Sequence, residues 1–284
     1  MNLNGIHFTH DTKFGFAFNT IIVLSLVPEN EMYNSNRLLE HIHDNKGNHK
    51  FTTQHLKAKT HHELNLLIQY LIDPPKAPRL PLLHIEYHGD YERGIELPSG
   101  EFVNWARWTS MLSAINAAAG LGMLVFMSGC HGESVRKNVT YDRISPFAFL
   151  ISAKSKVTAD ELLSTAKKFY SAIFAFSIQD VKSALEGSLS FKSLEREVCM
   201  GFALLHLKST GRVRIEEVIT QFISLGFSLS EARKIAKTSS KHIAVAFEHF
   251  VDVFYGGVKN LAWDYSDVLK FSNEIRLFRD AQKG

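Results

Sequence analysis

The segment "IEYHGDYERGIELPSG", residues 85–100, decides how the fold is interpreted. An apolar run that starts at Leu82 ends in His88 and Gly89, and charged residues follow at once. A second apolar run, "GMLVFMSGC" at 122–130, ends in the same way at Cys130. Both runs have the composition of buried strands. If the two strands are neighbours in a parallel sheet, His88 and Cys130 meet at the carboxyl edge of that sheet.

Strands alternate with amphipathic helices through the first two thirds of the chain. The predicted strands are 20–27, 50–58, 82–88, 122–128 and 146–152, and the predicted helices are 35–45, 60–72, 105–119 and 158–174. Residues 93–105 predict a hairpin that turns at 98–100. Thr60 and Thr158 are each followed three residues later by glutamate, a pattern typical of a helix N-terminus. The alternation predicts an α/β fold, with a mostly parallel sheet and helices on both faces.

The pattern changes near residue 177, after which the apolar spacing predicts helices. The segments 193–207, 215–227, 229–255 and 265–281 all have this spacing. We therefore expect residues 1–185 to form the α/β domain and residues 186–284 to form a helical C-terminal extension.

Composition narrows the class of protein. The 284 residues are 45% apolar and 21% charged, and the net charge is +3 with histidines neutral, which gives no indication of a nucleic-acid partner. The two cysteines do not make a disulfide framework, and we expect a cytoplasmic protein.

Residues 108–130 lack charged residues and have the length of a membrane span. Their polar residues and Gly120 and Gly122 favour a helix, a turn and a strand instead, so no membrane insertion is expected.

Thiol chemistry explains the pairing of a histidine with a cysteine. A free thiol is only a few per cent ionised at neutral pH, and a nearby imidazole can take its proton. Glycine beside both residues lets the backbone come close to a substrate, and its N–H can donate to a developing oxyanion. Taken alone, each residue has a simpler explanation, as a surface histidine or a packed cysteine.

His131 adjoins Cys130, but no further ligand follows at metal spacing, so neither a metal nor another cofactor is expected.

A strand ending in His-Gly, followed by a strand ending in a small residue and Cys, resembles the caspase-like cysteine proteases. This clan includes caspases, metacaspases, separase and CHAT-domain proteases. The separation of 130 − 88 = 42 positions is similar to the value of about 50 in caspases. "GIELPSGEFVNWARW" is similar to the segment after the histidine in CHAT domains, and Cys130-His131 is similar to the metacaspase motif. The resemblance covers residues 15–185 and implies a caspase-like three-layer sandwich.

The resemblance also implies an activity, that of a thiol-dependent endopeptidase. His88 would be the general base or ion-pair partner, and Cys130 the nucleophile. The backbone N–H groups of Gly89 and Cys130 would form the oxyanion hole. Expected partners are a protein substrate and a regulatory protein, with no nucleic acid. Small bacterial chains of this kind resemble effectors of antiviral defence. The rival hypothesis is a catalytically idle caspase-like binding module that docks a partner through its helical C-terminal region.

The position that helps set substrate preference in caspases and metacaspases carries a different residue here. Ser128 stands two residues before Cys130, where caspases have glutamine and metacaspases have aspartate, so neither specificity carries over. Asp90, Glu92 and Glu133 are the acids nearest the pair in sequence. They are candidates to orient His88 or to bind a basic side chain, and the alternatives are that they only solvate a loop or that the pocket is neutral.

Overall fold

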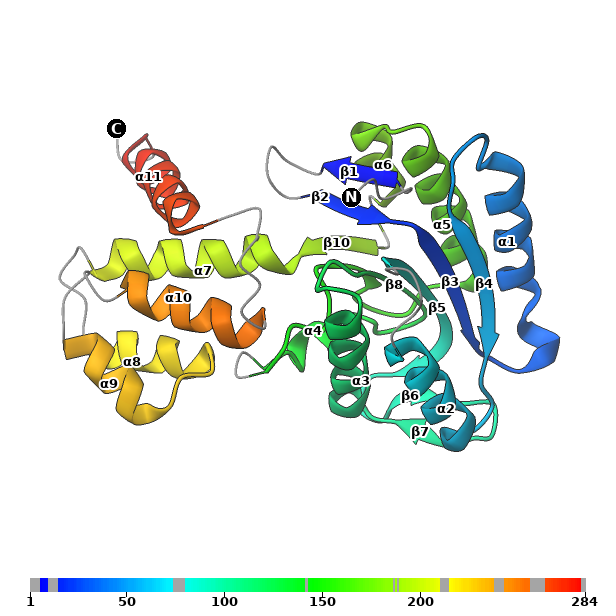
Figure 1. The fold of residues 1–284 in the computed structure, drawn as a ribbon, viewed down its shortest axis with the longest axis horizontal. Coiled ribbons are helices and arrows are strands. Elements are labelled where there is room, and N and C mark those ends of the chain that lie inside the picture. Colours follow the sequence, from blue (N-terminus) through cyan, green and yellow to red (C-terminus); the bar gives the residue numbers. More distant parts are fainter. Residues whose placement is uncertain are drawn as a thin grey trace. The chain divides into compact units, whose positions relative to one another are not determined.

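The structure is a computed structural model, shown in Figure 1. It describes residues 6–9, 15–73, 80–140, 143–185, 187, 189–209, 215–237, 243–255 and 264–281. The chain divides into two compact units, which are described separately. Unit 1 comprises Met1–Val139 and Pro146–Ser193, and unit 2 comprises Thr140–Ser145 and Leu194–Gly284.

Unit 1 is built on a mostly parallel sheet. Its strands are, in spatial order, β10 (Leu189–Ser193), β9 (Phe149–Ala153), β8 (Leu124–Ser128), β5 (Pro81–Asp90), β3 (Thr20–Leu26) and β4 (Thr52–Lys57). The pairings from β9 to β4 are parallel, and β10 is antiparallel to β9. A hairpin of β6 (Gly94–Glu96) and β7 (Phe102–Val103) extends from the end of β5. The expected α/β fold with a mostly parallel sheet is therefore confirmed.

Helical crossovers join the parallel strands. The helices of unit 1 are η1 (Glu29–Glu31), α1 (Tyr33–Asn45), α2 (His61–Ile72), α3 (Trp105–Ala118), α4 (Ser134–Lys137), α5 (Ala159–Phe174) and α6 (Ile178–Leu185). Thr158 and Glu161 form the reciprocal capping box of α5. Thr60 accepts from the Glu63 N–H, but the Glu63 carboxylate accepts from the Lys59 N–H at 2.6 Å. Both threonines therefore begin their helices as the sequence predicts.

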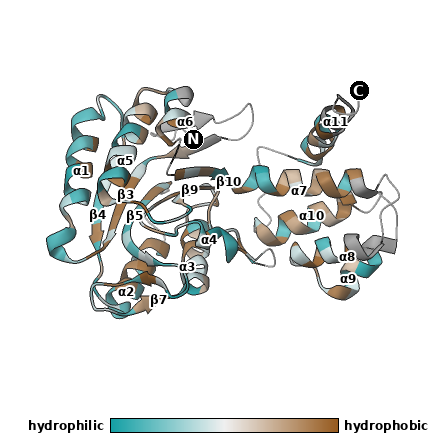
Figure 2. Cartoon of the chain, turned by 180° about the vertical axis from the view of Figure 1, so that it is seen from behind, coloured by the Kyte–Doolittle hydropathy of each residue, from teal (hydrophilic) through white to brown (hydrophobic). Residues whose placement is uncertain are grey.

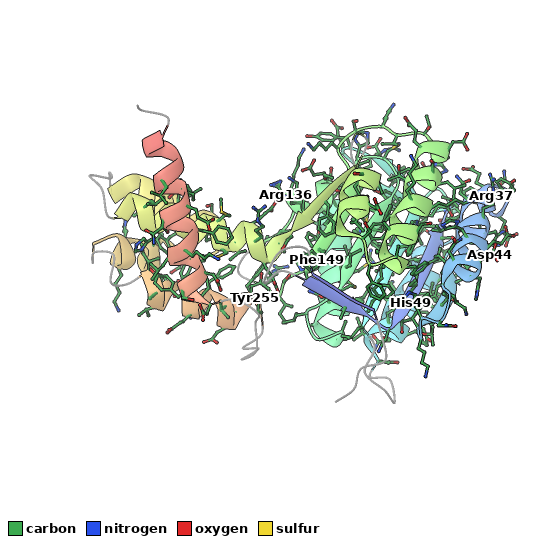
Figure 3. All side chains as sticks on the ribbon, turned by 90° about the horizontal axis from the view of Figure 1, so that it is seen from above. Arg37, Asp44, His49, Arg136, Phe149 and Tyr255 are labelled. Carbon is green, nitrogen blue, oxygen red and sulfur yellow. The ribbon has the colours of Figure 1, made fainter. Side chains whose placement is uncertain are left out.

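Helices cover both faces of the sheet. Alternate residues of each strand point to opposite faces, so each face packs through its own set of side chains. On one face, the core that includes Val23, Leu82 and Phe126 packs with α1 and α5. On the other face, the rings of Tyr87 and Trp105 meet with centroids 6.2 Å apart, which places α3 there. Figure 2 shows β3 and β5 largely in brown, the hydrophobic end of the scale, and the outer side of α1 in teal. Arg37 and Asp44 lie on that outer side, directed away from the sheet (Figure 3).

Strands appear in two places where the sequence analysis does not place them. A separate hairpin pairs β1 (Ile6–Thr9) with β2 (Gly15–Phe18). β10 falls in the region for which only helices are expected, and unit 1 ends after β10 rather than after residue 185. Pairing with β10 satisfies the backbone groups on the outer edge of β9, which an unpaired edge strand would leave open.

Unit 2 contains helices packed around aromatic rings. They are α7 (Leu194–Ser209), α8 (Ile215–Ser224), α9 (Leu229–Lys237), α10 (Ile243–Phe254) and α11 (Tyr265–Ala281). Phe202 on α7 contacts Phe247 and Phe250 on α10, with centroids 5.1 and 5.4 Å apart. Across the described parts of both units, no helix combines the length and apolar character that crossing a bilayer requires. Residues 108–130 are divided among α3, a turn and β8.

Candidate functional site

The register of two neighbouring strands brings His88 and Cys130 together. β5 and β8 are parallel, and their last paired residues are Glu86 and Ser128. His88 and Cys130 each lie two positions further along, at matching places beyond that pair. Adjacent strands are about 4.8 Å apart. The two side chains therefore leave the same edge of the sheet from neighbouring strands.

Both residues line one cavity of about 160 Å³ within unit 1. The cavity lies at the point where the strand order reverses, because the chain runs from β3 outward to β4 and then returns past β3 to β5. Open α/β sheets bind ligands in the crevice outside the carboxyl ends of such strands. Val27 after β3, His88 on β5 and Cys130 after β8 all contribute to the lining.

Close backbone packing explains the glycines beside the pair. A Cβ atom at Gly89 would overlap the carbonyl oxygen of Cys130, and one at Gly129 would overlap the carbonyl oxygen of Tyr87. The backbones at the two strand ends are therefore in direct contact. The Tyr87 hydroxyl also donates to the Cys130 carbonyl at 3.2 Å. These contacts pack the two strand ends closely around Gly89 and Cys130. The oxyanion hole formed by the N–H groups of these two residues stays a prediction.

His88 is oriented by an acid that the sequence analysis did not single out. Its Nε2 lies 2.7 Å from Oε2 of Glu31, at the end of η1. Both side chains are about half exposed, at 54% and 46%, so the pair sits at the mouth of the cavity. With Nε2 engaged by a carboxylate, Nδ1 is the nitrogen that remains for proton exchange with a thiol.

Cys130 lies beside the amino end of α5. Its thiol donates to the Val157 carbonyl at 3.6 Å, directly before the capping residue Thr158. Cys130 is partly accessible, whereas Cys199 is fully buried in α7. The two cysteines therefore differ in access to solvent.

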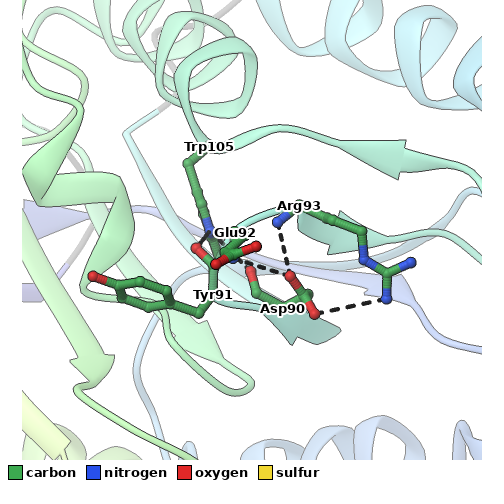
Figure 4. Close-up of polar contacts among 5 residues, drawn as sticks. All are labelled: Asp90, Tyr91, Glu92, Arg93 and Trp105. Carbon is green, nitrogen blue, oxygen red and sulfur yellow. Dashed lines mark hydrogen bonds and ion pairs between the residues drawn. The ribbon is translucent and has the colours of Figure 1, made fainter.

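The three acids named from the sequence lie away from the cavity lining, although Ser128 belongs to it. Asp90 accepts from the N–H groups of Glu92 and Arg93 and pairs with the Arg93 guanidinium at 3.6 Å (Figure 4). Glu133 pairs with Arg136 at 3.8 Å. Asp90 therefore shapes the turn after β5, with its backbone carbonyl also held by the Trp105 indole at 3.0 Å.

A partly buried acid on β5 does line the cavity. Glu86 is partly buried, and burial raises the pKa of its carboxyl group, while hydrogen bonds from Ser35 and Ser25 act against that rise. Ser25 Oγ lies 3.4 Å from the carboxylate, 2.9 Å from Ser35 Oγ and 2.9 Å from His55 Nε2. The alternation of polar side chains at 84, 86 and 88 within an apolar strand is the signal that identifies this face.

His84 lies deeper on the same face of β5. It is 3% exposed, and burial lowers the pKa of its imidazole to about 3. Its ring stacks on Phe126 with centroids 4.6 Å apart. Within the described residues, no polar atom is placed to bond its Nδ1. His84 thus contributes a buried, neutral ring to the cavity lining, while its Nδ1 is not accessible from the cavity.

Neither a protein-family model nor a curated protein matches this chain significantly. Among the described residues, no group of three or more His, Cys, Asp or Glu side chains is arranged to hold a metal ion. The chemistry available at the cavity is therefore judged from its own side chains. A thiol and an imidazole oriented by a carboxylate are groups that thiol-dependent acyl transfer uses.

Proposed function

We propose that the chain is a caspase-like cysteine endopeptidase, with Cys130 as nucleophile and His88 as base and acid. One observation carries the proposal: His88 and Cys130 line a single cavity at the carboxyl ends of adjacent parallel strands. Sequence resemblance to caspase-like proteases supports the same pair. The expected substrate is a protein.

The reaction proceeds in two acyl-transfer steps. His88 takes the thiol proton, and Cys130 Sγ attacks the peptide carbonyl, whose oxygen accepts hydrogen bonds from the N–H groups of Gly89 and Cys130. The C–N bond breaks as His88 returns the proton to the leaving amine, which leaves a thioester on Cys130. Water, deprotonated by His88, then hydrolyses the thioester and restores the thiol.

Glu31 acts in this scheme through His88. A carboxylate bonded to one ring nitrogen selects the tautomer and orientation of the other and stabilises the imidazolium that forms. Glu31 is therefore a positioning residue, which replaces Asp90, Glu92 and Glu133 in the role of orienting His88.

The test compares wild-type protein with Cys130→Ala in a cellular protein extract, followed by sequencing of new peptide N-termini. We expect new termini with the wild type, and a loss of at least about 10³-fold in the variant, as for removal of a catalytic nucleophile. Cys199→Ala serves as the matched control, provided that its melting temperature shows a folded protein. Cleavage at the wild-type rate by Cys130→Ala would remove the thiol from the mechanism.

The rival function, an idle module that docks a partner, is favoured by one observation. Several large apolar side chains of unit 2 are exposed, among them Leu204, Ile223, Leu229, Val245 and Leu277. Treatment with iodoacetamide separates the two hypotheses. A catalytic thiol reacts faster than a model thiol and loses that advantage in His88→Ala. An idle Cys130 reacts no faster than the model thiol with or without His88.

A further inference from the structure

The cavity beneath His88 and Cys130 has the form of a side-chain pocket. His88, Gly129 and Cys130 line it together with the sheet face, α1 and α5. Its deeper walls are mainly apolar and come from Val27, Leu38, Leu162, Leu163 and Ala166. At the rim, the Asn34 amide donates to the Ala159 carbonyl at 3.3 Å and joins the start of α1 to the start of α5. A side chain next to the attacked carbonyl can enter here.

Two acidic side chains line this pocket. Glu31 and Glu86 both line it, and neither lysine nor arginine occurs among its described lining residues. Glu31 is already engaged by His88 at 2.7 Å. Glu86 is therefore the carboxylate that a ligand can use. Its carboxylate oxygen lies 3.4 Å from Ser25 Oγ, and Ser25 Oγ lies 2.9 Å from both Ser35 Oγ and His55 Nε2.

The polar groups lie on one side of the pocket. Glu86, His84 and Ser128 share the sheet face toward α1 and α5, because 84 and 86 alternate along β5 and Ser128 is the register partner of Glu86. Ser128 offers a hydroxyl, and His84 contributes a buried neutral imidazole on the same face. Apolar walls opposite a carboxylate match a side chain with an aliphatic stem and a cationic head.

We propose that this pocket binds a basic side chain, arginine in preference to lysine, of the residue on the N-terminal side of the scissile bond, and that Glu86 selects it. The inference rests on the proposed peptidase function and assigns its substrate class. Arginine fits better because its planar head offers five donors, enough to pair with Glu86 and also reach the Ser128 hydroxyl. An aspartate side chain would meet two carboxylates and no cation in the described lining.

Fluorogenic peptides that differ only in this residue test the proposal. With the wild type we expect kcat/KM to be highest for arginine, then lysine, with leucine and aspartate at least about tenfold lower, since an unpaired buried charge is costly. Glu86→Gln should lower kcat/KM for arginine at least about tenfold and leave that for leucine unchanged or higher. Glu40→Gln, an exposed glutamate on α1, is the matched control and should change neither value.

A second measurement does not depend on peptide cleavage. N-acetylarginine amide should slow the alkylation of Cys130 by iodoacetamide in the wild type, and this protection should be absent in Glu86→Gln and with N-acetylleucine amide. Preference for leucine or aspartate, or equal protection by both amides, overturns the pocket assignment while leaving the peptidase proposal intact. Protection by arginine amide in a protein that cuts no peptide overturns the peptidase proposal and leaves a binding pocket for basic side chains.

Discussion

The two faces of β5 show how one strand serves two purposes. Toward α1 and α5 it presents His84, Glu86 and His88, the groups that line the cavity. Toward α3 it presents Leu83, Ile85 and Tyr87, which are buried. Because strand side chains alternate, six consecutive residues supply a polar site and its structural support on opposite faces. Substitution of a residue on the first face should change the reaction rate. Substitution of a residue on the second face should change the free energy of unfolding.

The largest effect on stability is expected at Trp105, on the supporting face. Trp105 is 5% exposed, packs on Tyr87 and donates to the Asp90 carbonyl at 3.0 Å. Trp105→Ala should lower the free energy of unfolding by about 3 to 5 kcal/mol. Urea denaturation followed by near-ultraviolet circular dichroism measures the loss. Tyr33→Ala, at a side chain that is 65% exposed, should change it by less than about 1 kcal/mol. Equal losses in the two variants would contradict the division between faces.

The next effect concerns Glu31, at the mouth of the polar face. Glu31→Gln should lower kcat about 10- to 100-fold with little change in KM, because substrate contacts remain while His88 loses its charged partner. Alkylation of Cys130 should slow as well, a readout that a purely structural role would not move. Glu29→Gln is the matched control, since Glu29 belongs to the same turn but pairs with Lys59 at 2.7 Å. A similar loss in both variants would show that the turn matters and the contact with His88 does not.

The sequence predicts some of the residues at the polar face of β5 and not others, for a physical reason. His88 and Cys130 are detectable because each ends an apolar run, and neighbouring strands then bring them to one edge. Glu31 lies 57 positions before His88, and its approach depends on the path of the chain after β3, which no local pattern encodes. Asp90 is close in sequence, but its carboxylate accepts from the backbone N–H groups of Glu92 and Arg93 in the turn after β5.

The strand at the sheet edge was missed for a related reason. β10 is short and lies between helices, so local patterning gives it little weight. Its pairing partner β9 lies far earlier in the sequence, with Leu189 paired to Ala153, 36 positions away, and Ser193 to Phe149, 44 positions away. Tertiary context decides such a segment, because edge pairing satisfies backbone groups that the segment cannot satisfy alone.

The smallest expected effect is a gain in stability, and it sharpens the contrast between the two faces of β5. Burial raises the pKa of Glu86, so the folded protein holds the proton more tightly than the unfolded chain does. Stability from this group is therefore complete below the unfolded pKa and is lost as the pH rises through the folded pKa. Glu86→Gln removes a buried charge at neutral pH while keeping the side-chain shape, and should raise the melting temperature by a few degrees at pH 8.

The same substitution should have no effect at pH 4, where glutamate is largely protonated in both states and resembles glutamine. Differential scanning calorimetry at both pH values measures the difference, with Glu40→Gln as the exposed control. Destabilisation at pH 8 would mean that Ser25 and Ser35 stabilise the carboxylate by more than its burial costs. A gain in stability combined with loss of arginine preference would instead identify Glu86 as an acid retained for binding at the expense of the fold.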